Sequence, residues 1–334
     1  MTAATTPIEA TRSGPITTLA ARLRREASVM GLLLLLGFLF VFTRLIEPNY
    51  GATGIQGLAI SALPLALAAV AQAIVVISGG IDLSIGSMMA LTSVVAASQM
   101  QGQSEEFGVL VALAVLGLGL LIGAINGALI VFTRVADIIV TLAMSFVWAG
   151  CALLVLGSPG GNASDWLADL TRGSIGTEWL PKPAIVLLLI VALVWIPVRW
   201  SRMGLSLYAI GSNQLAAFRS GVSVGRTKIL AYALAGLFAA FGGLALTAST
   251  GIGTPVPGGY TLTSVAAVVL GGVSLAGGRG GVVGPIVAVL VLALIRTDMT
   301  FLGINPNLAT VAQGVILIGV VMFGSLVQLR RARA

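Results

Sequence analysis

The chain has 334 residues, of which 57% are hydrophobic and 9% charged, and its mean hydropathy is +1.07. Soluble domains carry about 25% charged residues, and a soluble helical protein with a large core would need polar helix faces that these apolar runs lack. The net charge of +7 does not indicate nucleic-acid binding, because the basic residues lie in short loops and at the two ends instead of in a stripe interleaved with aromatics.

The N-terminal stretch 1–27 is polar, and the apolar run that follows it has no small-residue cleavage pattern directly after it. We interpret the stretch as a cytoplasmic segment and the run as a retained first span. Because a helix needs about 20 apolar residues to cross the hydrocarbon core, we expect an all-α membrane protein with about ten transmembrane helices. The candidate spans are 28–46, 56–78, 81–100, 107–132, 137–157, 183–198, 228–249, 259–275, 281–297 and 310–328. They form one polytopic domain, 28–328, followed by a basic cytoplasmic tail, 329–334.

The basic residues indicate the orientation of these spans. If ten spans alternate, one side of the membrane carries 14 of the 18 Lys and Arg residues and the other side carries four. The richer side holds Arg12, Arg22, Arg24, Arg25, Arg134, Arg199, Arg202, Arg219, Arg226, Lys228, Arg279, Arg330, Arg331 and Arg333. The poorer side holds Arg44, Arg172, Lys182 and Arg296. Because Lys and Arg concentrate on the cytoplasmic side, we expect both termini to be cytoplasmic.

The segment from Ser78 to Ser87 reads Ser-Gly-Gly-Ile-Asp-Leu-Ser-Ile-Gly-Ser and separates two apolar runs. Gly79 and Gly80 break the first run, and Asp82 and Ser84 stand at the start of the next helix. A carboxylate at this position caps a helix by accepting from the backbone N–H groups two and three residues on. The alternative is a broken helix that lines a polar pathway, where intramembrane carboxylates are found.

Two further polar side chains, Gln72 and Asn126, lie deep in apolar runs. Each is expected either to hydrogen-bond a neighbouring helix or to touch a polar solute in the pathway. Arg134 and Asp137, three residues apart at the junction of the fourth and fifth spans, are expected to form a local pair.

The eighth span, 259–275, is the least regular, since Gly271 and Gly272 interrupt it. A re-entrant hairpin that includes the ninth span is therefore an alternative to two full crossings. The run Val75-Val-Ile-Ser-Gly-Gly-Ile-Asp-Leu83 resembles Val268-Val-Leu-Gly-Gly-Val-Ser-Leu275. Transporters are often built from internal repeats, although two glycine-rich stretches also match by chance.

Two loops are long enough to carry structure of their own. The loop 158–182 is expected to face outward and to contain a short interfacial helix. The loop 199–226 is expected in the cytoplasm, where Gln214 to Ser220 suit a short helix that Gly221 stops. Its adjacent alanines would allow tight docking into a partner's groove, with Phe218 as an anchor. The alternative is a basic helix that lies on anionic lipid.

Catalysis is not expected. No Gly is followed by Lys, so the phosphate loop G-x-x-x-x-G-K-[ST] is absent, and there is no H-E-x-x-H or C-x-x-C motif. The chain has no histidine, and Cys151 is its only cysteine, which excludes a disulfide framework and the commonest general base and metal ligand. We expect no metal and no cofactor, and any ATP hydrolysis would take place in a separate subunit.

Three stretches together resemble one known family. They are the segment from Ser78 to Ser87, Ala209-Ile-Gly-Ser-Asn213 continued by Ala216-Ala-Phe-Arg-Ser-Gly-Val222, and Ala266-Ala-Val-Val-Leu-Gly-Gly-Val-Ser-Leu-Ala-Gly-Gly-Arg-Gly280. In this order they resemble the ribose/xylose/galactose-type permeases, which are the membrane subunits of bacterial binding-protein-dependent ABC importers. The likeness runs from the second span to the tenth.

The resemblance implies a multi-pass protein of the bacterial inner membrane that pairs with a second permease copy against two ATP-binding cassette ATPase subunits. A periplasmic solute-binding protein would deliver a sugar or sugar-like solute. The cytoplasmic helix resembles the coupling helix of the family, with Asn213, Gln214, Ala216, Ala217, Phe218, Arg219 and Gly221 as its residues. The broader permease signature has a Glu before Ala-Ala, whereas Leu215 or, in another alignment, Gln214 stands there in this chain. Arg219 is then the residue available for an ion pair with the ATPase.

Other classes of protein fit some of these features. A branched-chain amino-acid or nucleoside ABC permease is the nearest alternative. An ion-coupled secondary transporter would need several membrane-embedded carboxylates or a histidine relay, and Asp82 is the one deep carboxylate expected. A membrane scaffold or receptor would show a large soluble domain or a long tail, and neither is expected here.

Overall fold

The computed structural model describes residues 15–256 and 258–305 and the single positions 308, 311, 314, 315 and 319, with side chains from residue 29 onwards. Within these residues the protein is helical, and the only β-structure is two isolated bridges. The long elements are α1 (Pro15–Ile46), α2 (Ala52–Ile77), α3 (Ile85–Met100), α4 (Glu105–Thr133), α5 (Asp137–Val155), α11 (Val224–Thr250) and α13 (Val283–Phe301). The shorter ones are α6 (Asp165–Asp169), α7 (Lys182–Ile190), the π-helical segment Val191–Trp195, α8 (Ile196–Trp200), α9 (Arg202–Ser212), α10 (Gln214–Arg219) and α12 (Tyr260–Leu270).

Seven helices in the described part of the chain are long and apolar enough to cross a membrane: α1, α2, α4, α5, the continuous run from α7 to α8, α11 and α13. They confirm seven of the predicted spans. Helix α6 confirms the short helix expected in the loop 158–182. Helix α1 begins at Pro15, inside the segment expected to precede the first span. The predicted tenth span, 310–328, the tail and residues 1–14 lie outside the continuously described residues.

The predicted lengths of the third and eighth spans were wrong. Helix α3 has 16 residues, and α12 has 11. At 1.5 Å per residue, α12 is only about 16 Å long, roughly half the thickness of the hydrocarbon core. The third span is shortened because residues 81–84 form a non-helical segment before α3, and the eighth because the turn at Gly271 and Gly272 ends α12. Helix α13, in contrast, is long enough to cross on its own.

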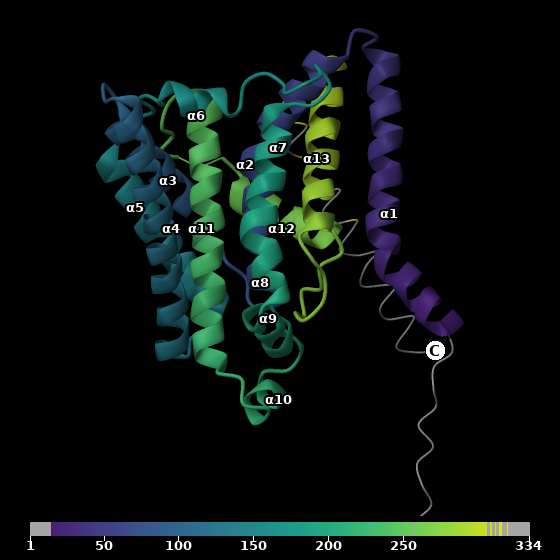
Figure 1. Ribbon diagram of the computed structural model, residues 1–334, viewed down its shortest axis with the longest axis vertical. Helices are drawn as coiled ribbons and strands as arrows, with labels where there is room; N and C mark the ends of the chain where they lie inside the picture. The colour runs from purple at the N-terminus through teal and green to yellow at the C-terminus, as the bar shows by residue number, and fades with distance from the viewer. Residues whose placement is uncertain are drawn as a thin grey trace, which may run out of the picture.

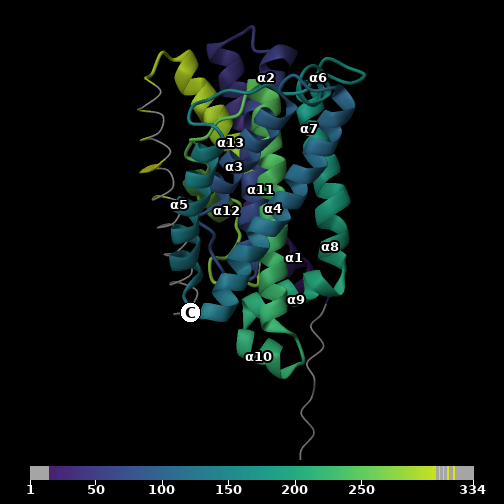
Figure 2. The same cartoon turned by 90° about the vertical axis from the view of Figure 1, so that its left-hand side faces the viewer.

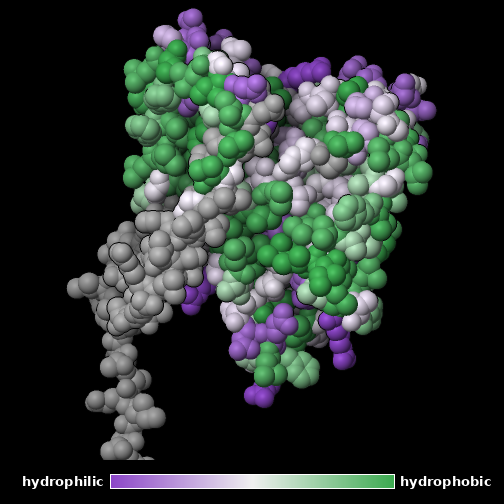
Figure 3. Space-filling model, turned by 180° about the vertical axis from the view of Figure 1, so that it is seen from behind, coloured by the Kyte–Doolittle hydropathy of each residue, from purple (hydrophilic) through white to green (hydrophobic). Residues whose placement is uncertain are grey.

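The helices stand side by side, with α6 at one end of the bundle and α10 projecting from the other (Figures 1 and 2). We call these the α6 end and the α10 end. In the view from behind, hydrophobic residues cover much of the middle of the surface, and hydrophilic residues gather towards the two ends (Figure 3). Arg134 ends α4 and Arg219 ends α10 at the same end, whereas Lys182 pairs with Asp169 of α6 at the opposite end. This arrangement matches the predicted alternation of the spans.

Helices α4 and α11 pack against each other through glycines four residues apart. A Cβ atom added at Gly123 would overlap the carbonyl oxygen of Tyr232, and one added at Gly119 would overlap Gly236 and Ala240. Small residues at this spacing let the backbones of two membrane helices approach closely. The high glycine content of the chain thus has a packing function at this contact.

We expect Gly123→Ala to lower the free energy of unfolding by about 1–3 kcal/mol, the usual cost of overpacking a close contact. The matched control is Gly117→Ala on the same helix, where an added Cβ meets nothing within 4 Å. Thermal unfolding in detergent measures both variants. Equal midpoints for the two would contradict the assigned packing.

Helices α2 and α12 end in the same way. Gly79 and Gly272 adopt positive φ angles of 86° and 78°, and their N–H groups donate to the carbonyls of Val76 and Val269. The next N–H group in each case reaches one residue further back, to Val75 or Val268, which completes a Schellman motif. The similarity between these two stretches of sequence therefore corresponds to two matching helix ends.

Candidate functional site

The break between α2 and α3, residues 78–84, is held by a chain of side-chain hydrogen bonds. Asp82 Oδ1 accepts from the backbone N–H of Ser84 at 2.7 Å and from its hydroxyl at 2.6 Å. Ser84 Oγ also accepts from Asn126 Nδ2 of α4 at 2.8 Å, and Asn126 Oδ1 accepts from Trp148 Nε1 of α5 at 3.1 Å. Since Ser84 is the N-cap residue of α3, this network ties the start of α3 to two other helices.

The residues predicted for the pathway or the break are only partly brought together. Asp82, Ser84 and Asn126 belong to the network, whereas Gln72 lies on α2 before the break. All four side chains are fully buried within the single chain. Asp82 Oδ2 and both polar atoms of the Gln72 amide make no hydrogen bond to any described residue. Buried polar atoms without partners are rare in folded proteins and need an explanation.

On the other side of the break lies a second polar cluster. Asp137, at the start of α5, accepts from Lys228 Nζ at 2.7 Å and from the Tyr232 hydroxyl at 2.8 Å, both on α11. A Cβ atom added at Gly80 would overlap Asp137 Oδ2 and the Tyr232 hydroxyl, so a larger residue there would displace this cluster. The predicted pair of Arg134 with Asp137 was wrong. Arg134 is the exposed C-cap of α4 in a left-handed conformation, and Asp137 turns inward to Lys228 instead.

We expect Lys228→Met to destabilise the protein by up to about 3 kcal/mol, because removing one partner of a largely buried ion pair leaves the other charge uncompensated. The side chains of Lys228 and Asp137 are each 13% exposed. Adding Asp137→Asn to Lys228→Met should restore much of the lost stability, because no buried charge is then left unpaired. The exposed Arg226→Met is the control and should leave the stability unchanged. Unfolding midpoints in detergent measure all three, and no recovery in the double variant would argue against the pair.

The loop predicted to carry a partner-binding helix folds into two helices, α9 and α10. Helix α9 begins at Ser201, whose hydroxyl accepts from the N–H groups of Met203 and Gly204. Sequence reasoning missed α9, although this N-cap serine was visible. The predicted short helix is confirmed by α10, which Gly221 stops at a φ of 84°. At its start, Asn213 Oδ1 accepts from the N–H of Ala216 at 2.9 Å.

Helix α10 presents an apolar face to the outside. Leu215 is 58% exposed and Phe218 67% exposed, three residues apart on the same helix. Ala216 is exposed as well, whereas Ala217 is buried against its own chain. The two alanines therefore do not share one docking surface as predicted: Ala216 faces outward and Ala217 anchors α10 to the protein.

The C-terminal end of α9 meets the end of α2 and the segment between α12 and α13 at a backbone contact. We call the segments 78–84 and 271–282 the two helix breaks. A Cβ atom added at Gly211 would overlap the carbonyl oxygen of Ile77, at the end of α2, and would crowd the N–H of Gly278. The Gly278 N–H itself donates to the Ile77 carbonyl at 2.9 Å. A Cβ atom added at Gly277 would likewise overlap the Gly211 carbonyl oxygen and the Gly79 Cα. We call this contact between Gly79, Gly211, Gly277 and Gly278 the glycine junction.

A second contact holds α9 to the segment between α12 and α13. The Tyr208 hydroxyl donates to the carbonyl of Gly280 at 2.8 Å, and the guanidinium of Arg199 lies 4.2 Å from the centre of the Tyr208 ring. Helix α9 is thus fixed to the ends of α2 and α12, and α10 follows it after a single residue.

No catalytic arrangement accompanies these features. The run Gly221-Val-Ser-Val-Gly225 has the G-x-S-x-G spacing of a hydrolase nucleophile, but it joins two helices, whereas that motif joins a strand to a helix. Among the described residues, no group of three or more His, Cys, Asp or Glu side chains is placed to hold a metal ion.

A bundle of apolar spans with broken helices, buried polar groups at the break and one projecting helix defines a membrane permease. The family model described as "Branched-chain amino acid transport system / permease component" matches residues 54–321, and the chain belongs to this family.

Curated relatives support the same class. The chain is 36% identical over 258 residues to the ribose import permease protein RbsC of Escherichia coli K12, a match that covers 76% of this chain and 79% of the relative. It is 34% identical over 256 residues to RbsC of Bacillus subtilis 168, covering 75% and 78%. It is 34% identical over 273 residues to the galactose/methyl galactoside import permease protein MglC of E. coli K12, covering 77% and 81%. No solved structure matches the chain. The chain is therefore a permease component in the family of binding-protein-dependent ABC importers that includes these proteins.

Proposed function

We propose that this permease forms the pathway for a sugar or sugar-like solute across the bacterial inner membrane. A periplasmic binding protein delivers the solute, and a separate ATP-binding cassette subunit hydrolyses ATP. The sugar is inferred from the relatives with ribose and galactose in their names. The single observation that carries the coupling to ATP is the connection of the projecting helix α10 through α9 to the two helix breaks.

The orientation follows from charge. Among the described residues, Arg134 and Arg219 of the richer set lie at the α10 end, so we place this end and both termini in the cytoplasm. The α6 end, with the acidic residues Asp165 and Asp169, then faces the periplasm. With the predicted tenth span, eight long helices are expected to cross the membrane, beside the shorter apolar helices α3 and α12.

In this orientation α10 is, of the described helices, the one that reaches furthest towards an ATPase (Figure 1). Leu215, Ala216 and Phe218 provide the apolar contact surface, and Arg219 provides a charge at its edge. A helix docked in a groove is a recurring mode of recognition. Movement of the ATPase would shift α10, and α9 would transmit the shift to the glycine junction.

The glycine junction would then move both helix breaks together, because α9 contacts the end of α2 and the segment after α12 at the same point. Asp82 lies in the break between α2 and α3, and Gln72 lies on α2 before it; the unpartnered polar atoms of both side chains lie inside the membrane domain. We propose that these atoms are exposed to the solute in a second conformation of the transporter, as alternating access requires. Ser84 and Asn126 hold the resting position of the break.

A second permease copy would complete the pathway. Helix α5 supports this, because it presents large apolar side chains on its outer face while its inner face carries Trp148 of the network. Phe146 is 73% exposed and Leu154 is 88% exposed. Lipid covers the remaining apolar surface.

Uptake by proteoliposomes that contain the assembled transporter tests the substrate. We expect saturable uptake of a radiolabelled sugar that requires ATP and the binding protein. Inhibition by leucine or a nucleoside, without inhibition by any sugar, would favour the amino-acid or nucleoside permease that the family description and the sequence leave as the alternative. Uptake that survives ATP depletion and collapses with an uncoupler would instead indicate an ion-coupled transporter.

A further inference from the structure

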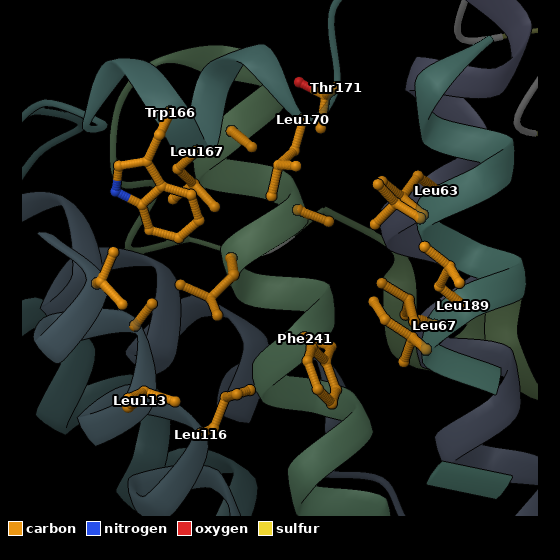
Figure 4. A pocket seen from close by; sticks show the side chains of 17 residues that line it. Leu63, Leu67, Leu113, Leu116, Trp166, Leu167, Leu170, Thr171, Leu189 and Phe241 are labelled. Carbon is orange, nitrogen blue, oxygen red and sulfur yellow. The ribbon is translucent and has the colours of Figure 1, made fainter. Parts of the chain in front are cut away.

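A recess of about 360 Å³ lies beneath α6, away from the helix breaks (Figure 4). Its walls come from α2, α4, α7 and α11. Trp166, Leu167 and Leu170 line it from α6, and Phe241 of α11 lies at the opposite end from this roof (Figure 4). Thr171 is the one hydroxyl in the lining, and that hydroxyl donates to the carbonyl of Ala168. The only other polar atom among the lining side chains is Trp166 Nε1. A polar solute would therefore lose its hydration in this recess for at most one side-chain hydrogen bond, so the lining suits a hydrocarbon.

The recess opens sideways, on the lipid-facing surface of the spans. Val109 and Leu113 of α4 and Leu189 of α7 line it and are still 44%, 61% and 53% exposed. The same helices are among those long and apolar enough to cross the membrane. The recess is therefore continuous with the surface that meets the acyl chains of the bilayer. Water does not fill apolar cavities of this kind, and an empty recess would forfeit the dispersion contacts of its walls.

The roof of the recess has the character of a membrane interface. Helix α6 places Trp166 and Leu167 towards the recess, whereas Asp165 and Asp169 are exposed on its other side. Tryptophan is enriched at the boundary between hydrocarbon and headgroups. Arg172, directly after the lining residue Thr171, is exposed at this level and suits a lipid phosphate.

We propose that one acyl chain of a membrane phospholipid occupies this recess, with its phosphate beside Arg172. The lipid would fill the space between α7 and the α4–α11 pair and so support α7, which runs directly into the π-helical segment after Ile190. This inference does not depend on the transported solute or on the ATPase.

The test uses the full-length permease in nanodiscs of phosphatidylcholine with or without bromine on the acyl chains. The quenching of Trp166 is obtained as the difference between the parent protein and its Trp166→Phe variant. We expect Ala248→Leu, which adds volume at a wall residue that is 1% exposed, to reduce this quenching at least twofold. The matched control is Ala114→Leu, which adds the same volume on the exposed face of α4. Each leucine variant is compared with the same variant carrying Trp166→Phe.

Native mass spectrometry supplies a second measurement on the same proteins. We expect one phospholipid retained per chain in the parent and in Ala114→Leu, and none in Ala248→Leu. Arg172→Gln should reduce retention while leaving the unfolding midpoint unchanged. If Ala248→Leu does not fold, Ala245→Leu blocks the same wall. Equal quenching and equal lipid retention in the blocked and control variants would overturn the proposal, as would a recess occupied by detergent alone.

Discussion

Gly211→Ala is expected to uncouple transport from ATP hydrolysis. The added methyl group would overlap the Ile77 carbonyl and crowd Gly278, so α9 must move away from the two helix breaks. The assembled transporter should still hydrolyse ATP, but solute transported per ATP should fall roughly tenfold, since mutations along a coupling route remove about 0.5–2 kcal/mol. Uptake and phosphate release in the same proteoliposomes measure the ratio.

The control for this variant is Gly117→Ala in α4, where an added Cβ meets nothing within 4 Å. It should retain the parental ratio of solute to ATP. Gly277→Ala changes the other side of the glycine junction and should reproduce the uncoupling. If Gly211→Ala assembles with the ATPase and transports normally, α9 does not transmit the motion and the proposed route is wrong.

Phe218→Asp is expected to weaken binding of the ATPase subunit roughly 30-fold or more, since losing an aromatic anchor at the centre of an interface costs about 2 kcal/mol or more. Phe218 is 67% exposed on α10, so the change should leave the fold of the permease intact. Binding of the purified ATPase to immobilised permease nanodiscs gives the dissociation constant.

Val256→Asp is the matched control, because Val256 is also 67% exposed but lies between α11 and α12 near the α6 end. It should bind the ATPase normally, and Phe218→Leu should retain most of the affinity. If Val256→Asp weakens binding of the ATPase as much as Phe218→Asp does, α10 is not the docking helix.

The sequence predicted most of the fold because a membrane span can be recognised from the composition of a short stretch of chain. Runs of about 20 apolar residues were sufficient to predict seven spans. The lengths of α3 and α12 were not predictable in this way. Hydropathy does not distinguish an apolar residue in a helix from one in a turn or an extended segment, and both spans lose residues to such segments.

The candidate site was predicted less completely, because its important contacts join residues far apart in the chain. The short helix stopped by Gly221 depends on neighbouring residues alone, and that prediction was confirmed by α10. The pairing of Asp137 with Lys228 spans 91 residues and was missed in favour of the neighbouring arginine. The glycine junction was missed for the same reason. Nothing in the sequence around Gly211 indicates that α2 and the segment after α12 pack against it.

Purification of the tagged permease from its native membrane in mild detergent tests the central claim most directly. We predict that a stoichiometric ATP-binding cassette protein purifies with the parent chain and is lost when residues 214–221 are scrambled. A permease that purifies without an ATPase, and still moves solute into vesicles in the absence of ATP, would contradict the account.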